Sequence, residues 1–101
     1  MPLPERLDPT QKPALDEEVT WDELVEIVGA VWSSELDDPT EEFALAYLEA
    51  NIPGADVSTL IRWPGEWFNN RWFEEAELSP EQIVEHALQR CEREIAGDPG
   101  A

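Results

Sequence analysis

The stretch SPEQIV at residues 79–84 carries the clearest structural signal in the chain. Ser79 followed by Gln82 is a capping box, in which each side chain satisfies a free backbone amide at the start of a helix. Pro80 suits the first helical position, where an amide hydrogen would have no partner. The apolar residues that follow at helical spacing are Ile83, Val84, Ala87, Leu88, Cys91 and Ile95. This pattern predicts an amphipathic helix, and Gly97 suits its C-terminal end.

Two further helix starts of the same design lie upstream. TWDE at residues 20–23 is a second capping box, and DPTE at residues 38–41 combines a capping Asp38 with a proline at the first helical position. The apolar stripe after the first start consists of Trp21, Leu24, Val25, Val28, Val31 and Trp32. The stripe after the second consists of Phe43, Ala46, Tyr47 and Ala50, with Leu45 and Leu48 at its edges. Both stripes predict amphipathic helices.

The segment between the second and the last of these helices is less regular. Pro-Gly at residues 53–54 is a turn signal, and residues 57–63 precede Pro64, which disfavours a helical residue before it. We expect a short helix here. A strand over residues 59–63 is the alternative, but no partner strand is evident elsewhere. Residues 65–78 are interpreted as a long aromatic connection.

These elements predict an all-α fold, a small four-helix bundle with a short third helix. Residues 1–18 contain four prolines and no apolar period, so we expect an extended or disordered arm. The folded domain is expected over residues 19–96, followed by a tail at residues 97–101. A chain of 101 residues can bury a core without disulfides.

Charge is the strongest clue to function. The chain has 24 Asp and Glu residues against six Lys and Arg residues, a formal net charge of −18. A field of this size attracts strongly basic surfaces, and the commonest of these are surfaces that hold nucleic acid. The charge therefore indicates a basic partner of the nucleic-acid-handling kind. A role in solubility and a generally acidic proteome are the alternatives.

Catalysis and metal binding have little support in the sequence. The single histidine, His86, lies five residues from the single cysteine, Cys91, and no third group is at hand to orient the pair. We expect His86 at the surface or the boundary and Cys91 in the core. No CxxC, HExxH, calcium-loop or phosphate-loop motif occurs. We expect no enzyme activity and no cofactor, while a weak divalent-cation site among Asp37, Asp38 and Glu41 stays open.

The sequence favours a cytoplasmic protein. No apolar run approaches the roughly 18 residues that a membrane helix needs, so no membrane contact is expected. The first residues, Met-Pro-Leu-Pro-Glu, have neither the basic nor the apolar region of a signal peptide. The single cysteine cannot form an internal disulfide, which fits a reducing compartment.

Five tryptophans provide the second clue to function. Trp21 and Trp32 lie on the first helical stripe and are expected in the core. The least regular part of the chain holds a cluster of aromatic residues: Trp63, Trp67, Phe68, Trp72 and Phe73. Exposed aromatic side chains beside charge are typical of interface hot spots. We therefore expect at least one of Trp63 and Trp67 to contact a partner.

Acidic residues gather at the second helix and just before it. They are Glu35, Asp37, Asp38, Glu41, Glu42 and Glu49. Solvated charge on the back of a helix is one interpretation, and a footprint for a basic partner is the other. Arg62 is one of only six basic residues, and it is either an ion-pair partner of a neighbouring acid or a contact residue.

Two motifs in this order, LIRWP at residues 60–64 and LSPEQIV at residues 78–84, resemble those of the bacteriocin immunity proteins of the colicin and pyocin nuclease type. The short third helix of that family carries Asp-Leu-Ile-Tyr-Tyr-Pro, and its fourth helix opens with Ser-Pro-Glu-x-Ile-Val. Thr59 stands at the Asp of the family motif, Arg62 at its first Tyr and Trp63 at its second. The connection between the two motifs is longer here than in the family.

The resemblance, which covers about residues 19–96, implies a four-helix fold and a one-to-one complex with the nuclease domain of a toxin, without direct nucleic-acid binding. It also implies that the second helix selects the partner and the third anchors it. The candidate partner-binding residues are Asp37, Asp38, Glu41, Glu42, Glu49, Thr59, Arg62, Trp63 and Trp67. Two other functions stay open: a nucleic-acid mimic, against which the aromatic cluster argues, and an acidic helical adaptor subunit.

Overall fold

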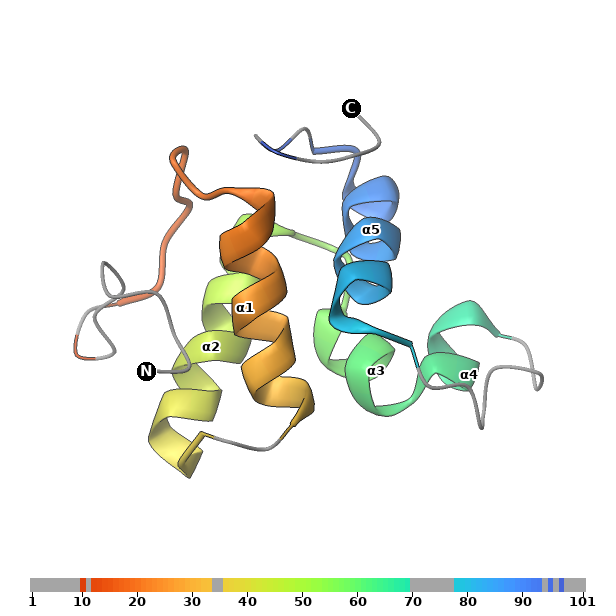
Figure 1. Ribbon diagram of the computed structural model, residues 1–101, viewed down its shortest axis with the longest axis horizontal. Helices are drawn as coiled ribbons and strands as arrows, with labels where there is room; N and C mark the ends of the chain where they lie inside the picture. Colours follow the sequence, from red (N-terminus) through yellow and green to blue (C-terminus); the bar gives the residue numbers. More distant parts are fainter. Residues whose placement is uncertain are drawn as a thin grey trace.

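The protein is helical, as Figure 1 shows for its computed structural model. The structure describes residues 10, 12–33, 36–69, 78–93, 95 and 97. Within these residues there is no strand, so the predicted all-α class is confirmed. The described part forms five helices: α1 (Trp21–Trp32), α2 (Asp38–Asn51), α3 (Val57–Arg62), α4 (Pro64–Phe68) and α5 (Pro80–Cys91).

Helix α4 replaces the start of the connection that the sequence predicts over residues 65–78. Pro64 ends α3 as expected, but its fixed φ angle also suits the first residue of a new helix. The carbonyl of Trp63 accepts from the amides of Glu66 at 3.0 Å and Trp67 at 3.1 Å, which closes the first turn of α4. The rest of the predicted connection, residues 70–77 with Trp72 and Phe73, lies outside the described residues.

The three long helices begin at side-chain caps. Thr20 and Ser79 form the capping boxes predicted for α1 and α5. The cap of α2 is Asp37 and not Asp38, and its carboxylate accepts from the Thr40 amide at 3.3 Å. The proline of this segment is thus the second residue of the helix, where an amide hydrogen would still lack a partner within the helix.

The core lies where α1 packs against α2, α3 and α5. The largest of its fully buried side chains are Leu24, Ile27, Leu48, Ile52, Leu60 and Ile83. Trp21 is buried as predicted, but Trp32 is 46% exposed, because it is the last residue of α1 and the chain turns at Ser33. On α2 the predicted Ala46 is exposed and Ala44 is buried instead, so the face of α2 that meets the core is displaced from the predicted one.

The end of the predicted arm is docked on the domain. The side-chain nitrogen of Asn51, a fully buried residue at the end of α2, donates to the carbonyls of Ala14 at 3.1 Å and Tyr47 at 2.9 Å. Its side-chain oxygen accepts from the Asp16 amide at 2.6 Å. Arg93, which follows α5, donates to the backbone carbonyls of Asn51 at 2.7 Å and Asp16 at 2.8 Å. The predicted domain boundary at residue 18 is therefore too late.

We call Ala14, Asp16, Asn51 and Arg93 the arm clasp. It joins the chain before α1, the end of α2 and the segment after α5 through hydrogen bonds that are partly buried. Buried polar groups are stable only when such bonds are made. The arm clasp therefore places residues 14–20 in the folded domain and not in a free arm.

Deleting residues 1–16 is expected to destabilise the domain, because the deletion removes bonding partners of Asn51 and Arg93. A buried polar group without a partner costs about 1–3 kcal/mol. We expect the melting temperature to fall by roughly 4–20 °C, as measured by circular dichroism. Deletion of residues 1–9, which leaves the arm clasp intact, is the matched control. Equal melting temperatures for the two deletions would show that the docked arm contributes nothing to stability.

Candidate partner-binding surface

Most of the predicted contact residues meet at one end of the bundle. An ion pair between Arg62, the last residue of α3, and Glu41, near the start of α2, brings these two helix ends together. The end of α1 is close to the start of α2 because only a short segment joins them. Figure 1 shows all three helix ends in the lower half of the view. We call the following residues the end surface: Asp37, Asp38, Glu41, Glu42, Arg62 and Trp63.

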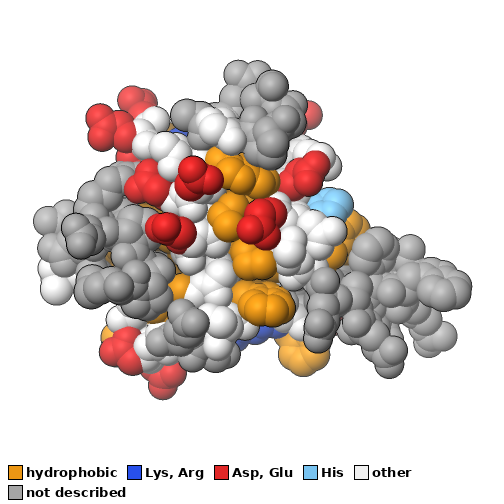
Figure 2. Space-filling model, in the orientation of Figure 1, with side chains coloured by type: hydrophobic (Ala, Val, Ile, Leu, Met, Phe, Trp, Pro, Cys, Tyr) orange, Lys and Arg blue, Asp and Glu red, His pale blue; other side chains and the backbone are white. Residues whose placement is uncertain are grey.

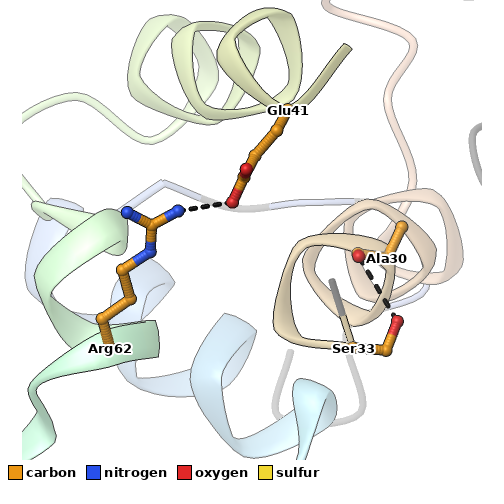
Figure 3. A network of polar contacts seen from close by, with 4 residues as sticks. All are labelled: Ala30, Ser33, Glu41 and Arg62. Atoms are coloured by element: carbon orange, nitrogen blue, oxygen red, sulfur yellow. Dashed lines mark hydrogen bonds and ion pairs between the residues drawn. The ribbon is translucent and has the colours of Figure 1, made fainter. Parts of the chain in front are cut away.

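The ion pair of the end surface is seen from close by in Figure 3. Arg62 donates from Nη2 to Oε1 of Glu41. The side chain of Arg62 is 49% exposed and that of Glu41 24%, so water screens the pair. Such pairs contribute less than about 1 kcal/mol to stability. The structure gives Arg62 the ion-pair role that the sequence left open, and the pair holds α3 against the first turns of α2.

Trp63 is the most exposed large hydrophobic side chain in the described residues, at 64%. Its backbone is held on both sides. The amide donates to the Thr59 carbonyl at 2.6 Å, and the carbonyl accepts the first amides of α4. The indole itself has no hydrogen-bond or ring partner among the described residues. An exposed aromatic side chain on a fixed backbone can fill a pocket of a partner with little loss of entropy.

Trp67, the other predicted aromatic contact, faces the domain. Its Nε1 donates to the Ala55 carbonyl, and its ring packs edge-on to Phe68 with the centroids 4.7 Å apart. The guanidinium of Arg90 on α5 lies 4.8 Å from the centroid of the Trp67 ring. Trp67 therefore joins α4 to α5 and to the turn before α3. Of the two tryptophans, Trp63 is the one whose side chain remains available to a partner.

Of the other predicted contact residues, Thr59 lies near Trp63 and Glu49 lies away from the end surface. Thr59 is half-buried on α3, one turn before Trp63, and accepts its amide. Glu49 is exposed on α2 but lies eight residues beyond Glu41, a distance of about 12 Å along the helix axis. The structure therefore does not bring Glu49 to the end surface. Glu35 lies outside the described residues.

His86 and Cys91, the two side chains weighed as catalytic, have structural contacts. His86 is half-buried, as predicted, and its ring meets Phe68 edge-on with the centroids 4.9 Å apart. Cys91 is half-buried against the core, less deeply than predicted, and its Sγ donates to the Leu88 carbonyl at 3.6 Å. The structure does not bring the two residues together with a third orienting group in the part of the chain that it describes.

Acidic side chains surround apolar surface in this protein. Figure 2 shows them on both sides of a strip of hydrophobic side chains that runs between α1 and α5. Exposed large hydrophobic side chains in the described part are Leu15, Trp32 and Trp63. Apolar surface with a charged rim is the composition of protein interfaces.

Neither a metal centre nor a membrane segment is found in the described part of the chain. No group of three or more His, Cys, Asp or Glu side chains is placed there to hold a metal ion, so Asp37, Asp38 and Glu41 do not form the cation site that the sequence left open. Among the same residues, no helix has both the length and the apolar character needed to cross a bilayer.

Trp32 is a residue of this region that the sequence analysis assigned to the core. It lies at the end of α1, beside the start of α2, and nearly half of its side chain is exposed. The sequence could have indicated this exposure, because Trp32 is the last apolar residue before Ser33. The last turn of a helix can extend beyond the helices that cover it.

Comparison of the chain with protein-family models, with curated proteins and with solved structures finds no match. The resemblance to immunity proteins is therefore supported by the sequence motifs alone.

Proposed function

We propose that this protein is an acidic inhibitor that binds a basic toxin domain of the bacteriocin nuclease type and protects the cell that produces both. The observation that carries the proposal is the exposed Trp63, held on a fixed backbone beside the acidic start of α2. An aromatic anchor with a charged rim is the composition of interface hot spots. The net charge of −18 supplies attraction for a basic partner.

The arrangement of the helices supports the same proposal. Under this proposal α1, α2, α3 and α5 would correspond, in order, to the four helices of the immunity proteins, and α4 would be an addition after the motif. Trp63 stands at the second aromatic position of that motif. The differences from the family motif are Thr59, Arg62, whose guanidinium binds Glu41, and Trp63. The connection that follows Pro64 is also longer, and it begins with the short helix α4.

Inhibition would follow from charge and bulk. A nuclease domain holds its substrate on a basic surface, and an inhibitor with a net charge of −18 that covers part of this surface repels the phosphate backbone. The acids at the start of α2 would select among related partners, and Trp63 would supply most of the affinity. No catalytic group is needed for this action, which takes place in the cytoplasm as a one-to-one complex.

The decisive experiment uses the open reading frame next to the gene of this protein. If that frame encodes a protein with a basic nuclease-like C-terminal domain, the two purified chains should form a one-to-one complex, and nuclease activity should disappear at equimolar inhibitor. A complex that forms without loss of nuclease activity would contradict the proposal. Binding to unrelated DNA-binding proteins with equal affinity would instead support a nucleic-acid mimic.

Association with the basic domain should be fast and sensitive to salt. Electrostatic steering raises association rates to about 10⁸ M⁻¹s⁻¹ at low salt, against about 10⁵–10⁶ M⁻¹s⁻¹ without it. Added salt shortens the range of this attraction to roughly 8 Å at physiological ionic strength, so the rate should fall steeply. Stopped-flow fluorescence measures it, and a rate that is independent of salt would exclude steering as the purpose of the acidity.

Two charge variants on α2 test which part of the acidic surface steers the partner. Glu42→Gln, at the end surface, should lower the association rate by a modest factor and leave the dissociation rate nearly unchanged. Glu49→Gln removes the same charge near the other end of the helix and should have a smaller effect. Equal effects of the two variants would show that net charge acts without regard to position.

A further inference from the structure

A second exposed indole lies at the end of the bundle that carries the end surface. Trp32 is the last residue of α1 and is 46% exposed, and Trp63 follows the last residue of α3 and is 64% exposed. The ends of these two helices lie in the same half of the molecule in Figure 1, next to the start of α2. Helix α1 contacts both α2 and α3. Two of the three large hydrophobic side chains exposed in the described residues are thus at this end.

The indole of Trp32 takes no part in closing the end of α1. The end of α1 is closed by Ser33, whose amide donates to the Gly29 carbonyl at 3.0 Å and whose hydroxyl donates to the Ala30 carbonyl at 3.3 Å. Figure 3 shows this turn of α1 beside the ion pair of Arg62 and Glu41. Among the described residues the Trp32 indole has neither a hydrogen-bond nor a ring partner. Its exposed face is therefore available for a contact outside the chain.

The start of α2, which follows Trp32 along the chain and is paired with Arg62, the neighbour of Trp63, carries carboxylates. Asp37 caps α2, and its neighbour Asp38 and the residue Glu42 are exposed in the first turns of that helix. The only cation that the structure describes at this end, Arg62, is already bound to Glu41. A cation that approaches an indole here finds an aromatic face together with carboxylates that carry no such partner. The site therefore favours a positively charged group.

We infer that Trp32 and Trp63 together form a two-indole platform that receives arginine side chains of the partner. This inference rests on the proposed function in one respect, that the partner is a basic protein domain. A guanidinium stacks on an indole face and binds carboxylates through its planar fork, whereas an ammonium does neither as well. The protein contains the same pairing internally, because Arg90 lies 4.8 Å from the centroid of the Trp67 ring.

Charge complementarity decides between a basic protein and a second copy of this chain as the occupant. Two copies would each bring a net charge of −18 to the contact, and the repulsion would oppose association. A basic domain gains attraction from the same charge. The inference therefore commits to a basic protein whose arginines cover both indoles.

The platform can be tested without the partner by titrating the full chain with a hexa-arginine peptide. The five tryptophans give separate indole signals in a ¹H–¹⁵N spectrum, and single Trp→Phe variants assign them. We expect the signals of Trp32 and Trp63 to shift together, and those of the buried Trp21 and the internally packed Trp67 to stay nearly fixed. Hexa-lysine, which has equal charge, should cause smaller shifts and bind more weakly.

The matched variants are Trp32→Ala and Trp32→Phe. Loss of one cation–aromatic contact at an exposed site should weaken hexa-arginine binding about 2- to 5-fold, and Trp32→Phe, which keeps a ring, should recover part of the affinity. If Trp32→Ala unfolds the protein, the titrations of the wild type and of Trp32→Phe still test whether both indoles bind the peptide. Signals of Trp63 that shift alone, shifts spread evenly over the acidic surface, or equal responses to both peptides would overturn the platform.

The result separates this inference from the proposed function. Localised shifts at both indoles together with an active, uninhibited nuclease would leave the platform standing and reject the inhibitor. Inhibition by the wild type that is unchanged in Trp32→Ala would keep the inhibitor and reject the platform. If the free wild-type chain forms dimers and Trp32→Ala is monomeric, the Trp32 indole serves self-association. That outcome also rejects the platform.

Discussion

Trp63→Ala is expected to weaken binding of the basic partner by roughly 2–4 kcal/mol, or about 30- to 700-fold in Kd, as truncation of a hot spot does. The melting temperature should stay nearly unchanged, because the side chain is 64% exposed and the backbone contacts of residue 63 do not depend on the indole. Isothermal titration calorimetry and thermal melts measure the two quantities on the same preparations.

Trp67→Ala is the matched control and should show the opposite pattern. It removes a hydrogen bond to Ala55, ring contacts with Phe68 and His86, and the contact with Arg90. We expect a loss of roughly 2–4 kcal/mol in the free energy of unfolding, because truncating a packed tryptophan leaves a cavity. A Trp63→Ala protein that unfolds, or that binds as tightly as the wild type, would show that the end surface is misplaced.

Asn51→Ala is expected to have the largest effect on stability of any polar substitution in the described residues. The variant removes the donor to the Ala14 carbonyl, the acceptor of the Asp16 amide and one of the acceptors of Arg93. We expect a loss of about 3–5 kcal/mol, because the variant removes several partly or fully buried hydrogen bonds at once and leaves a cavity at a fully buried position. For a domain of this size the melting temperature would fall by roughly 15–30 °C.

Two further substitutions show whether the hydrogen bonds of Asn51 are the cause. Asn51→Asp keeps the size of the side chain and both acceptor bonds but places an oxygen against the carbonyls of Ala14 and Tyr47, so it should also destabilise the fold although it leaves no cavity. Gln89→Ala changes an exposed amide on α5 and should shift stability by less than about 0.5 kcal/mol. If Asn51→Ala has the same melting temperature as the wild type, the arm clasp does not stabilise the fold.

The long helices were predictable because their signals are local. The boxes at Thr20 and Ser79 act within four residues, and the apolar period repeats along a single helix. Helix α4 was missed because five residues complete little more than one turn and show no period. The displaced face of α2 has a different origin, since Ala44 and Ala46 are chemically equal and only the neighbouring helices decide which of them is buried.

The arm clasp and the exposure of Trp32 depend on contacts that no local pattern encodes. Asn51 bonds to residues 35 and 37 positions before it and to Arg93, 42 positions after it. In sequence it is simply a polar residue at the end of a helix. The acids of the end surface were predictable from the charge of the chain, and Trp63 from a motif. The inward orientation of Trp67 was not predictable, because it depends on contacts with Arg90 and Ala55.

The arm clasp also bears on the order of events during synthesis of the chain. Arg93 closes it through a bond to Asp16 across 77 positions of sequence. Contacts between residues so distant in sequence form late, because the loop must close before they gain energy. On the ribosome the helices α1 and α2 are made, and can begin to form, before Arg93 is added. In a nascent chain the arm clasp would therefore stay open, and it closes only after the segment that follows α5 has left the ribosome.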